Sequence, residues 1–254
     1  MSSKNTQQTI RALFLDLSGV LYEGDTLVEG AVDAVKRFRE RDLILRFVTN
    51  TATKSTAQIL EKLRGMGIPL EDDELFTAPI AARALIRKKG WRPYCLVHKQ
   101  IRSDFQDDDI ENPTCVVVGD AREDLTYGSL NKAFRLIKNG APLIGIGYNR
   151  CFKGEEGLML DAGAFIHALE WAAETEAIIT GKPSPAFFEE IIASAGVAPA
   201  ECMMVGDDAE SDVAAAMEAG LQGTQVRTGK FSEGDERKLP EDAQIIDSIA
   251  DLME

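Results

Sequence analysis

The chain has 254 residues, of which 44% are hydrophobic and 28% charged, enough apolar side chains for one large globular domain or two small ones. Its net charge of −14 disfavours nucleic acids and anionic membranes as partners. No stretch approaches the roughly 18 apolar residues of a membrane span, and residues 1–5 lack the apolar core of a signal peptide. The four cysteines show no C-x-x-C spacing, so we expect reduced thiols, a cytoplasmic protein and no zinc site.

The first part of the chain predicts two strand–helix units. An apolar run from Ala12 ends at Asp16 and is followed directly by a glycine-containing turn, which is typical of a buried parallel strand. Ligands bind at the carboxyl ends of such strands, so Asp16 is expected at a functional edge. After a short polar excursion over 23–25, the expected elements are a helix to about residue 40, a strand over 43–48 and a helix opened by the capping-box pattern of Ser55 and Gln58.

The middle of the chain, from about residue 80, continues the alternation with new lengths. The expected elements are a helix over 81–89, strands over 94–98 and 115–118, a helix over 125–138, a strand over 143–146, a glycine-containing turn and a helix over about 162–174. The acidic run 107–109 is expected to be a solvated loop. This region is large enough to form a small α/β domain of its own.

The last part of the chain returns to the same pattern. The expected elements are a strand over 177–180, a helix around 187–192, a strand over 202–205, a helix ending at Gly220, a strand through 225–226 and a short helix from residue 247. Strands that alternate with helices predict an α/β protein with a parallel sheet and right-handed crossovers. A dinucleotide site is not expected, because no G-x-G-x-x-G follows the first strand.

Four polar elements end predicted strands or follow them, and together they suggest phosphoryl chemistry. They are Asp16, Thr49-Asn50, Lys182 and Asp207-Asp208. Acidic oxygen ligands suit Mg²⁺, and phosphoryl transfer needs a positioned nucleophile, charge neutralisation and donors to the phosphoryl oxygens. Each element alone is better explained by a turn or a helix cap, but a chance combination of all four is a poor explanation. Since the chain has only two histidines, a histidine-based triad or metal cage is not expected.

The ordered set of motifs resembles the four motifs of the haloacid dehalogenase (HAD) superfamily. The motifs are Asp16-x-Ser18-Gly19, Thr49-Asn50, Gly181-Lys182-Pro183 and Gly206-Asp207-Asp208-x-x-x-Asp212. The long insert between the second and third motifs is similar to the C2-type cap of class IIA of that superfamily. The resemblance covers nearly the whole chain. It implies a Rossmann-like HAD core with a parallel sheet, built from residues 1–79 and 177–254, and a smaller α/β C2-type cap domain over residues 80–176.

The resemblance also implies a role for each motif residue in a Mg²⁺-dependent phosphatase. As the nucleophile, Asp16 would form an aspartyl-phosphate, and Lys182 would neutralise its charge. Phosphoryl oxygens would be held by Thr49, Asn50 and Thr51. The metal ligands would be Asp16, the backbone carbonyl of Ser18, Asp207, and Asp208 and Asp212 either directly or through the second shell. The cap would close over the site, and its loop over 148–150 presents Arg150 as a substrate contact or, equally, as a packing residue.

One position departs from the superfamily pattern. Most phosphatases of the superfamily carry a second aspartate two residues after the nucleophile as general acid, and here that position is Ser18. The substrates expected are therefore small phosphorylated molecules with good leaving groups: aryl phosphates, pyrophosphate, or phosphoramidates such as phosphohistidine and phospholysine. Glu23 or Asp25 is a rival acid. The alternative is a phospho-ligand binding or interaction protein that keeps the fold but turns over weakly; related proteins suggest a homodimer.

Overall fold

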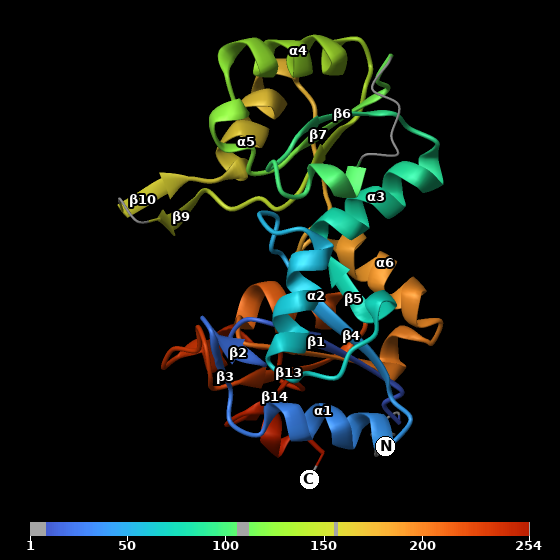
Figure 1. The fold of residues 1–254 in the computed structure, drawn as a ribbon, viewed down its shortest axis with the longest axis vertical. Coiled ribbons are helices and arrows are strands. Elements are labelled where there is room, and N and C mark those ends of the chain that lie inside the picture. Colours follow the sequence, from blue (N-terminus) through green and yellow to red (C-terminus); the bar gives the residue numbers. More distant parts are fainter. Residues whose placement is uncertain (1–8, 106–111, 155–156, 254) are drawn as a thin grey trace, which may run out of the picture. The chain divides into compact units, whose positions relative to one another are not determined.

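The computed structural model describes residues 9–105, 112–154 and 157–253. The acidic run 107–109 and the segment 1–5 lie outside these residues. The chain divides into two compact units (Figure 1). The first unit comprises Met1–Thr49, Lys62–Leu75 and Ile191–Glu254, and the second comprises Asn50–Glu61 and Phe76–Glu190. No helix of the described residues is long and apolar enough to cross a membrane.

The first unit is built on the larger sheet, a six-stranded sheet with the order β14-β13-β12-β1-β4-β5. Its strands are β1 (Ala12–Asp16), β4 (Ile44–Thr49), β5 (Leu75–Thr77), β12 (Cys202–Gly206), β13 (Gln222–Val226) and β14 (Gln244–Ile246). The strands from β14 to β4 pair in parallel, as the alternation of strands and helices predicts. All five side chains of the central strand β1 are buried, which explains its uninterrupted apolar run.

The register of this sheet brings the ends of three strands into line. Leu15 pairs with Phe47 of β4 on one side and with Val205 of β12 on the other. The next residues along β1 and β12 are Asp16 and, after Gly206, Asp207. The carboxyl ends of neighbouring parallel strands therefore present polar residues at one edge, where open α/β sheets bind ligands.

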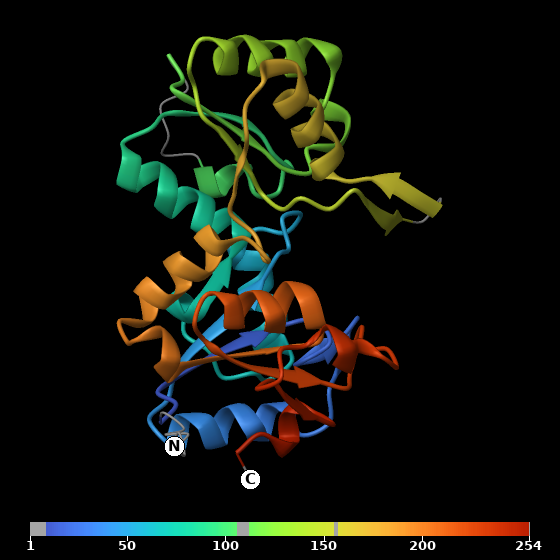
Figure 2. The same ribbon diagram turned by 180° about the vertical axis from the view of Figure 1, so that it is seen from behind.

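Helices cover both faces of this sheet (Figure 2). The helix α1 (Ala31–Glu40) buries Ala31, Ala34, Val35 and Phe38, the spacing of one helical face. On the other face lies a π-helical segment, Ala209–Ala214, that continues into α7 (Ala215–Glu218). The helix predicted to end at Gly220 is thus wound wider at its start. The polar excursion after β1 is a small hairpin of β2 (Tyr22–Glu23) and β3 (Thr26–Leu27).

Two helices have residues in both units: α2 (Thr56–Gly65) and α6 (Pro185–Ala195). The predicted capping box at the start of α2 is confirmed. The backbone N–H of Ser55 donates to Oε1 of Gln58 at 2.9 Å, and the N–H of Gln58 donates to Oγ of Ser55 at 3.3 Å.

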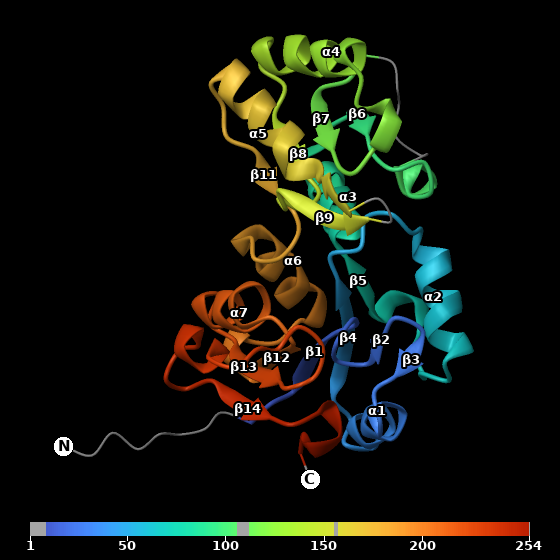
Figure 3. The same cartoon turned by 90° about the vertical axis from the view of Figure 1, so that its left-hand side faces the viewer.

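The second unit contains a four-stranded parallel sheet with the order β11-β8-β7-β6 (Figure 3). Its strands are β6 (Pro93–Leu96), β7 (Cys115–Val118), β8 (Leu143–Gly145) and β11 (Ile178–Ile179). Its helices are α3 (Ala78–Lys89), α4 (Tyr127–Lys138) and α5 (Ala162–Ala173). Val116 and Val118 pack with α4 and α5, whereas Cys115 and Val117 pack with α3. This alternation along β7 is the period of two expected for a strand covered on both faces.

Short elements are where the sequence-based prediction differs from the structure. The segment predicted as a turn before α5 contains an antiparallel hairpin of β9 (Cys151–Gly154) and β10 (Gly157–Leu160). The predicted tail helix is a single 3₁₀ turn over Ile249–Asp251, preceded by the unpredicted strand β14. Strands of three or four residues carry too few alternations for a periodic signal, so their pairing partners decide them.

Candidate active site

Three aspartates of the first unit lie together at the carboxyl edge of its sheet. Asp16, Asp207 and Asp212 each offer a carboxylate oxygen, and these oxygens all lie within 4.8 Å of one another. The three residues are between 2% and 8% exposed. Buried like charges at this spacing repel one another unless a cation or hydrogen-bond donors offset them. The cluster is therefore able to hold a metal ion, and an all-oxygen donor set of this kind suits a hard divalent cation.

Asp212 reaches the cluster because of the wide turn and because of Gly206. The segment Ala209–Ala214 is π-helical, a geometry that is frequent at functional sites. A Cβ on Gly206 would lie 2.4 Å from Oδ2 of Asp212, closer than any side chain permits. The absence of a side chain at position 206 therefore lets the Asp212 carboxylate approach the end of β12, where the backbone N–H of Asp208 donates to it at 3.3 Å.

Asp208 does not belong to this cluster of three among the described residues. Its Oδ1 accepts hydrogen bonds from the backbone N–H groups of Glu210 at 3.2 Å and Ser211 at 3.0 Å, so it caps the segment that follows. Its Oδ2 lies 3.4 Å from Nζ of Lys230. Burial alone would raise the pKa of Asp208, but the hydrogen bonds of Ser211 and the nearby lysine outweigh it and hold the pKa below its usual value.

A loop to which the sequence analysis assigned no role holds Asp207 from the other side. The backbone N–H of Lys230 donates to Oδ2 of Asp207 at 2.9 Å. Gly19 and Gly229 both have positive φ angles, and a Cβ on either would lie within 2.2 Å of the same oxygen. Two backbone segments far apart in the chain thus close on one carboxylate, a contact that only residues without side chains allow.

The segment that follows Asp16 contains Ser18 and both candidate acids, Glu23 and Asp25. Ser18 is exposed, and the Gly19 N–H next to it donates to the carbonyl of Tyr22 at 2.8 Å. The Oε1 atom of Glu23 accepts a hydrogen bond from the Gly229 N–H at 2.7 Å. The side chain of Asp25 is 97% exposed and forms an ion pair with Lys62 at 3.0 Å. Asp25 is thus held by Lys62, whereas Glu23 is held at Gly229, the same glycine that closes on Asp207.

The second and third motifs are joined by a reciprocal pair of hydrogen bonds. The buried Lys182 donates its backbone N–H to Oδ1 of Asn50 at 2.9 Å, and Nδ2 of Asn50 donates to the Lys182 carbonyl at 2.8 Å. Both residues belong to the second unit, whereas the buried Thr49 ends β4 in the first. Thr51 is half-buried directly after Asn50. The Asn50 amide therefore fixes the backbone of the lysine segment in addition to any contact with a ligand.

Arg150 belongs to the second unit, as does Asn50. It is exposed and lines a separate cavity with Tyr148 and His167. The hydroxyl of Tyr148 donates to the carboxylate of Glu170, and this hydrogen bond, followed by partial burial, raises the pKa of Tyr148 to about 12. The role of Arg150 as a substrate contact stays a prediction.

Comparisons with known proteins agree with this geometry. Two family models match the chain, one described as haloacid dehalogenase-like hydrolase over residues 13–111 and one as HAD-hydrolase-like over residues 179–252. Human haloacid dehalogenase-like hydrolase domain-containing protein 2 is 42% identical over 232 residues, which are 91% of this chain and 90% of that protein. The chain belongs to the haloacid dehalogenase-like hydrolases. Human phospholysine phosphohistidine inorganic pyrophosphate phosphatase is 38% identical over 252 residues, which are 96% of this chain and 93% of that protein.

Solved structures extend the likeness to the whole fold. The 4-nitrophenylphosphatase of Thermotoga maritima is 28% identical, with a TM-score of 0.85 and 96% of each chain covered. The p-nitrophenyl phosphatase of Archaeoglobus fulgidus is 27% identical, with a TM-score of 0.86 and 96% of this chain and 98% of that chain covered. The resemblance to class IIA of the family is thereby confirmed, and the protein is a phosphatase of this family.

Proposed function

We propose that the protein is a Mg²⁺-dependent phosphatase that forms an aspartyl-phosphate on Asp16. The observation that carries this proposal is the position of Asp16 at the end of the central strand, within 4.8 Å of two other buried carboxylates. We assign the metal to Asp16, Asp207 and Asp212 with the carbonyl of Ser18, because Asp208 is used as a helix cap. When bound, Mg²⁺ would neutralise the carboxylates and the phosphoryl oxygens.

The remaining motif residues would hold the phosphoryl group. Lys182 is 6% exposed, and a buried ammonium is stabilised where it meets a carboxylate or phosphoryl charge. Nδ2 of Asn50 has a second hydrogen beyond the one donated to the Lys182 carbonyl, and we assign it to a phosphoryl oxygen together with donors from Thr49 and Thr51. In this proposal residues 1–79 and 177–254 act as the core and residues 80–176 as the cap.

The substrates we propose are small phosphorylated molecules with good leaving groups. A serine at position 18 is too weak an acid to protonate a leaving alkoxide near neutral pH. Asp25 pairs with Lys62 and Oε1 of Glu23 accepts from the Gly229 N–H, so we assign the role of the acid to neither. Aryl phosphates, pyrophosphate and phosphoramidates need little help from an acid, and two relatives carry such substrates in their names.

The alternative, a phospho-ligand binding protein with little turnover, is decided by assay. We expect wild-type protein with MgCl₂ to hydrolyse 4-nitrophenyl phosphate and to carry an acid-stable phosphoryl group when quenched during turnover. Asp16→Asn should lose at least about 10³-fold in kcat and carry no phosphoryl group, because an amide cannot form the acyl-phosphate. Asp33→Asn, on the exposed side of α1, is the matched control for loss of one carboxylate.

Two results would contradict the proposal. Hydrolysis by Asp16→Asn at a rate near that of the wild type would exclude covalent catalysis by this residue. Binding of phosphate without measurable turnover by the wild type would favour the alternative.

A further inference from the structure

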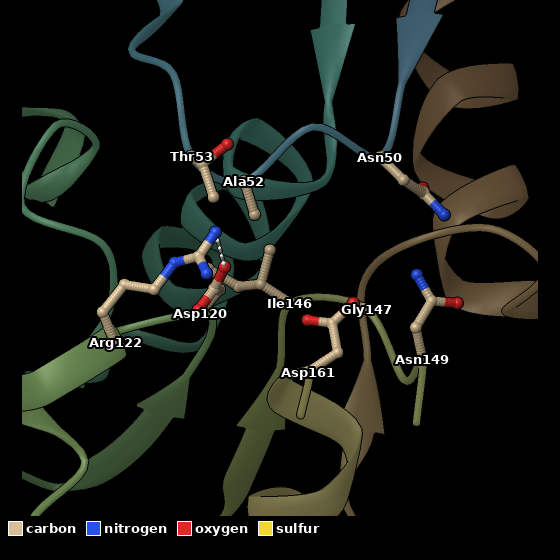
Figure 4. A pocket seen from close by; sticks show the side chains of 9 residues that line it. All are labelled: Asn50, Ala52, Thr53, Asp120, Arg122, Ile146, Gly147, Asn149 and Asp161. Carbon is tan, nitrogen blue, oxygen red and sulfur yellow. Dashed lines mark ion pairs between the residues drawn. The ribbon is translucent and has the colours of Figure 1, made fainter. Parts of the chain in front are cut away.

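The second unit contains a charged cavity that no motif predicts. It has a volume of about 210 Å³ and is drawn in Figure 4. Among its lining residues are Asn50 from the second motif and three charged residues, Asp120, Arg122 and Asp161. Asp120 follows the end of β7, and Asp161 is the residue before α5. The cavity therefore lies at the carboxyl edge of this sheet, where parallel α/β sheets bind ligands.

The charges of this cavity do not balance. Nη2 of Arg122 lies 3.0 Å from Oδ2 of Asp120, an ion pair whose two side chains are 31% and 11% exposed. Asp161 accepts a hydrogen bond from the N–H of Ala162 at 2.7 Å, and no lysine or arginine among the described residues forms an ion pair with it. Figure 4 shows the carboxylates of Asp120 and Asp161 pointing into the same space. The cavity is thus lined by two carboxylates and one guanidinium, which pairs with Asp120.

The excess negative charge affects the pKa of the buried Asp120 carboxylate. Burial raises the pKa of Asp120, and the nearby negative charge of Asp161 raises it further, against the lowering effect of Arg122. An added positive charge in the cavity would stabilise the ionised Asp120 carboxylate and so offset the effects of burial and of Asp161 on its pKa. A phosphatase binds anionic substrates, so a cavity with excess negative charge suits a part of the substrate other than its phosphoryl group.

The walls are held in place by backbone contacts. The N–H of Asp161 donates to the carbonyl of Arg150 at 3.1 Å, and the N–H of Gly163 donates to the carbonyl of Asn149 at 3.0 Å. A Cβ on Gly163 would lie 2.5 Å from that same carbonyl oxygen. The backbone at the start of α5 is therefore held against the loop that carries Asn149, and the Asp161 side chain is held by the N–H of Ala162.

We propose that this cavity receives the leaving group of the substrate and that Asp161, with Asp120, selects leaving groups that carry a cationic nitrogen. The proposal rests on the proposed function, because Asn50 links the cavity to the phosphoryl group. The hydrogen bonds between Asn50 and Lys182 hold these two residues together within the second unit. An ammonium or guanidinium at Asp161 would form a charge-assisted hydrogen bond in a site partly shielded from water.

The test compares three aryl phosphates that differ only at the far end of the ring. They are 4-(2-aminoethyl)phenyl phosphate, which is cationic, 4-ethylphenyl phosphate, which is neutral, and 3-(4-phosphonooxyphenyl)propionate, which is anionic. We expect wild-type kcat/KM to be at least about 10-fold higher for the cationic than for the neutral substrate. Asp161→Asn, which keeps a good helix cap, should reduce this ratio to below about 3.

Asp124→Asn is the matched control. Asp124 lies on the same loop as Arg122, forms an ion pair with Arg102 at 2.9 Å and does not line the cavity. Its substitution removes the same charge from the same unit and should leave the wild-type ratio unchanged. An equal loss in both variants would show a general effect of net charge and would overturn the subsite.

A binding measurement separates this inference from the proposed function. Titration calorimetry with tyramine, the cationic product, needs no turnover, and we expect Asp161→Asn to weaken its binding at least about 10-fold. Tyramine binding that depends on Asp161 in a protein without phosphatase activity would leave the subsite standing and the proposed function wrong. Turnover without any preference for the cationic substrate, or a preference for the anionic one that Arg122→Ala removes, would overturn the subsite.

Discussion

In the proposed mechanism, Ser18 is the residue that most limits the chemistry of the site. It is exposed two positions after Asp16, where most phosphatases of the family carry an aspartate. A positioned general acid typically contributes about 10²- to 10⁴-fold to a rate. Of the two rival acids, Asp25 pairs with Lys62, and Oε1 of Glu23 accepts a hydrogen bond from the Gly229 backbone. The rate should therefore depend steeply on the basicity of the leaving group.

Ser18→Asp tests this account. We expect the variant to raise kcat at least about 10-fold for alkyl phosphates and little for aryl phosphates, because only the poor leaving group needs a proton. The added charge near the aspartate cluster should instead raise KM for all substrates alike. Kinetics of both enzymes across a graded series of leaving groups distinguish the two effects. Shallow, parallel dependences in wild type and variant would refute a missing acid.

The pKa of Tyr148 is controlled mainly by one hydrogen bond. Its hydroxyl donates to Glu170, which raises its pKa to about 12 from an ordinary value near 10. The neutral phenol is favoured in the folded state. This contribution to stability is thus complete below about pH 10 and is lost as the pH rises toward 12.

Glu170→Gln should lower the Tyr148 pKa toward 10, because the charged acceptor is lost. Absorbance titration of tyrosinate in the wild type and the variant should differ by one tyrosine between pH 10 and 12. The same comparison in a Tyr148→Phe background should show no difference. Identical titrations of wild type and Glu170→Gln would show that this hydrogen bond does not control the pKa.

At the scale of elements, the turn after β12 combines stability with the geometry of the site. Asp208 caps the segment Ala209–Ala214, and the wide winding of that segment delivers Asp212 to the cluster. One residue supports the helix start while another, four positions on, faces the proposed metal. This division of roles explains why three aspartates occur within six residues.

Asp208→Ala should lower the free energy of unfolding by about 1 kcal/mol in chelator, because two backbone N–H groups lose their acceptor. Asp208→Asn should cost only a few tenths of a kcal/mol, since asparagine caps equally well and the Lys230 pair is 69% exposed on the lysine side. Denaturant unfolding of the three proteins measures this difference. Equal losses for both variants would assign the effect to charge instead of to the cap.

At the scale of the whole molecule, the net charge of −14 includes three buried carboxylates that lie side by side. A divalent cation that binds only the folded state stabilises it by mass action. The melting temperature of the whole protein should therefore show whether a cation binds at these three side chains.

Mg²⁺ at about 100 times its dissociation constant should stabilise the protein by about 2.7 kcal/mol relative to chelator, and activity should return with it. Ca²⁺ should raise the melting temperature but restore activity poorly, because its looser and larger coordination shell disfavours in-line geometry. Asp212→Asn should lose most of this stabilisation, whereas Asp33→Asn should keep it. Full activity in chelator would exclude a metal at the cluster.

The sequence alone determined the α/β class, the long central elements and the order of the motifs. Apolar runs such as that of β1 and the helical spacing of α1 are local signals, and the capping box of Ser55 and Gln58 is contained in four residues. Such features depend on residues close together in the chain and can therefore be predicted from the sequence.

Only the tertiary structure decided which side chains meet. The sequence left Asp208 and Asp212 as equal candidates, and the wide turn together with the missing side chain of Gly206 brought Asp212 to the cluster. The same holds for the cavity of Asp120 and Asp161, whose residues lie on separate loops 41 positions apart. Contacts of this kind depend on strand register and on the close approach of distant backbones, neither of which leaves a periodic trace in the sequence.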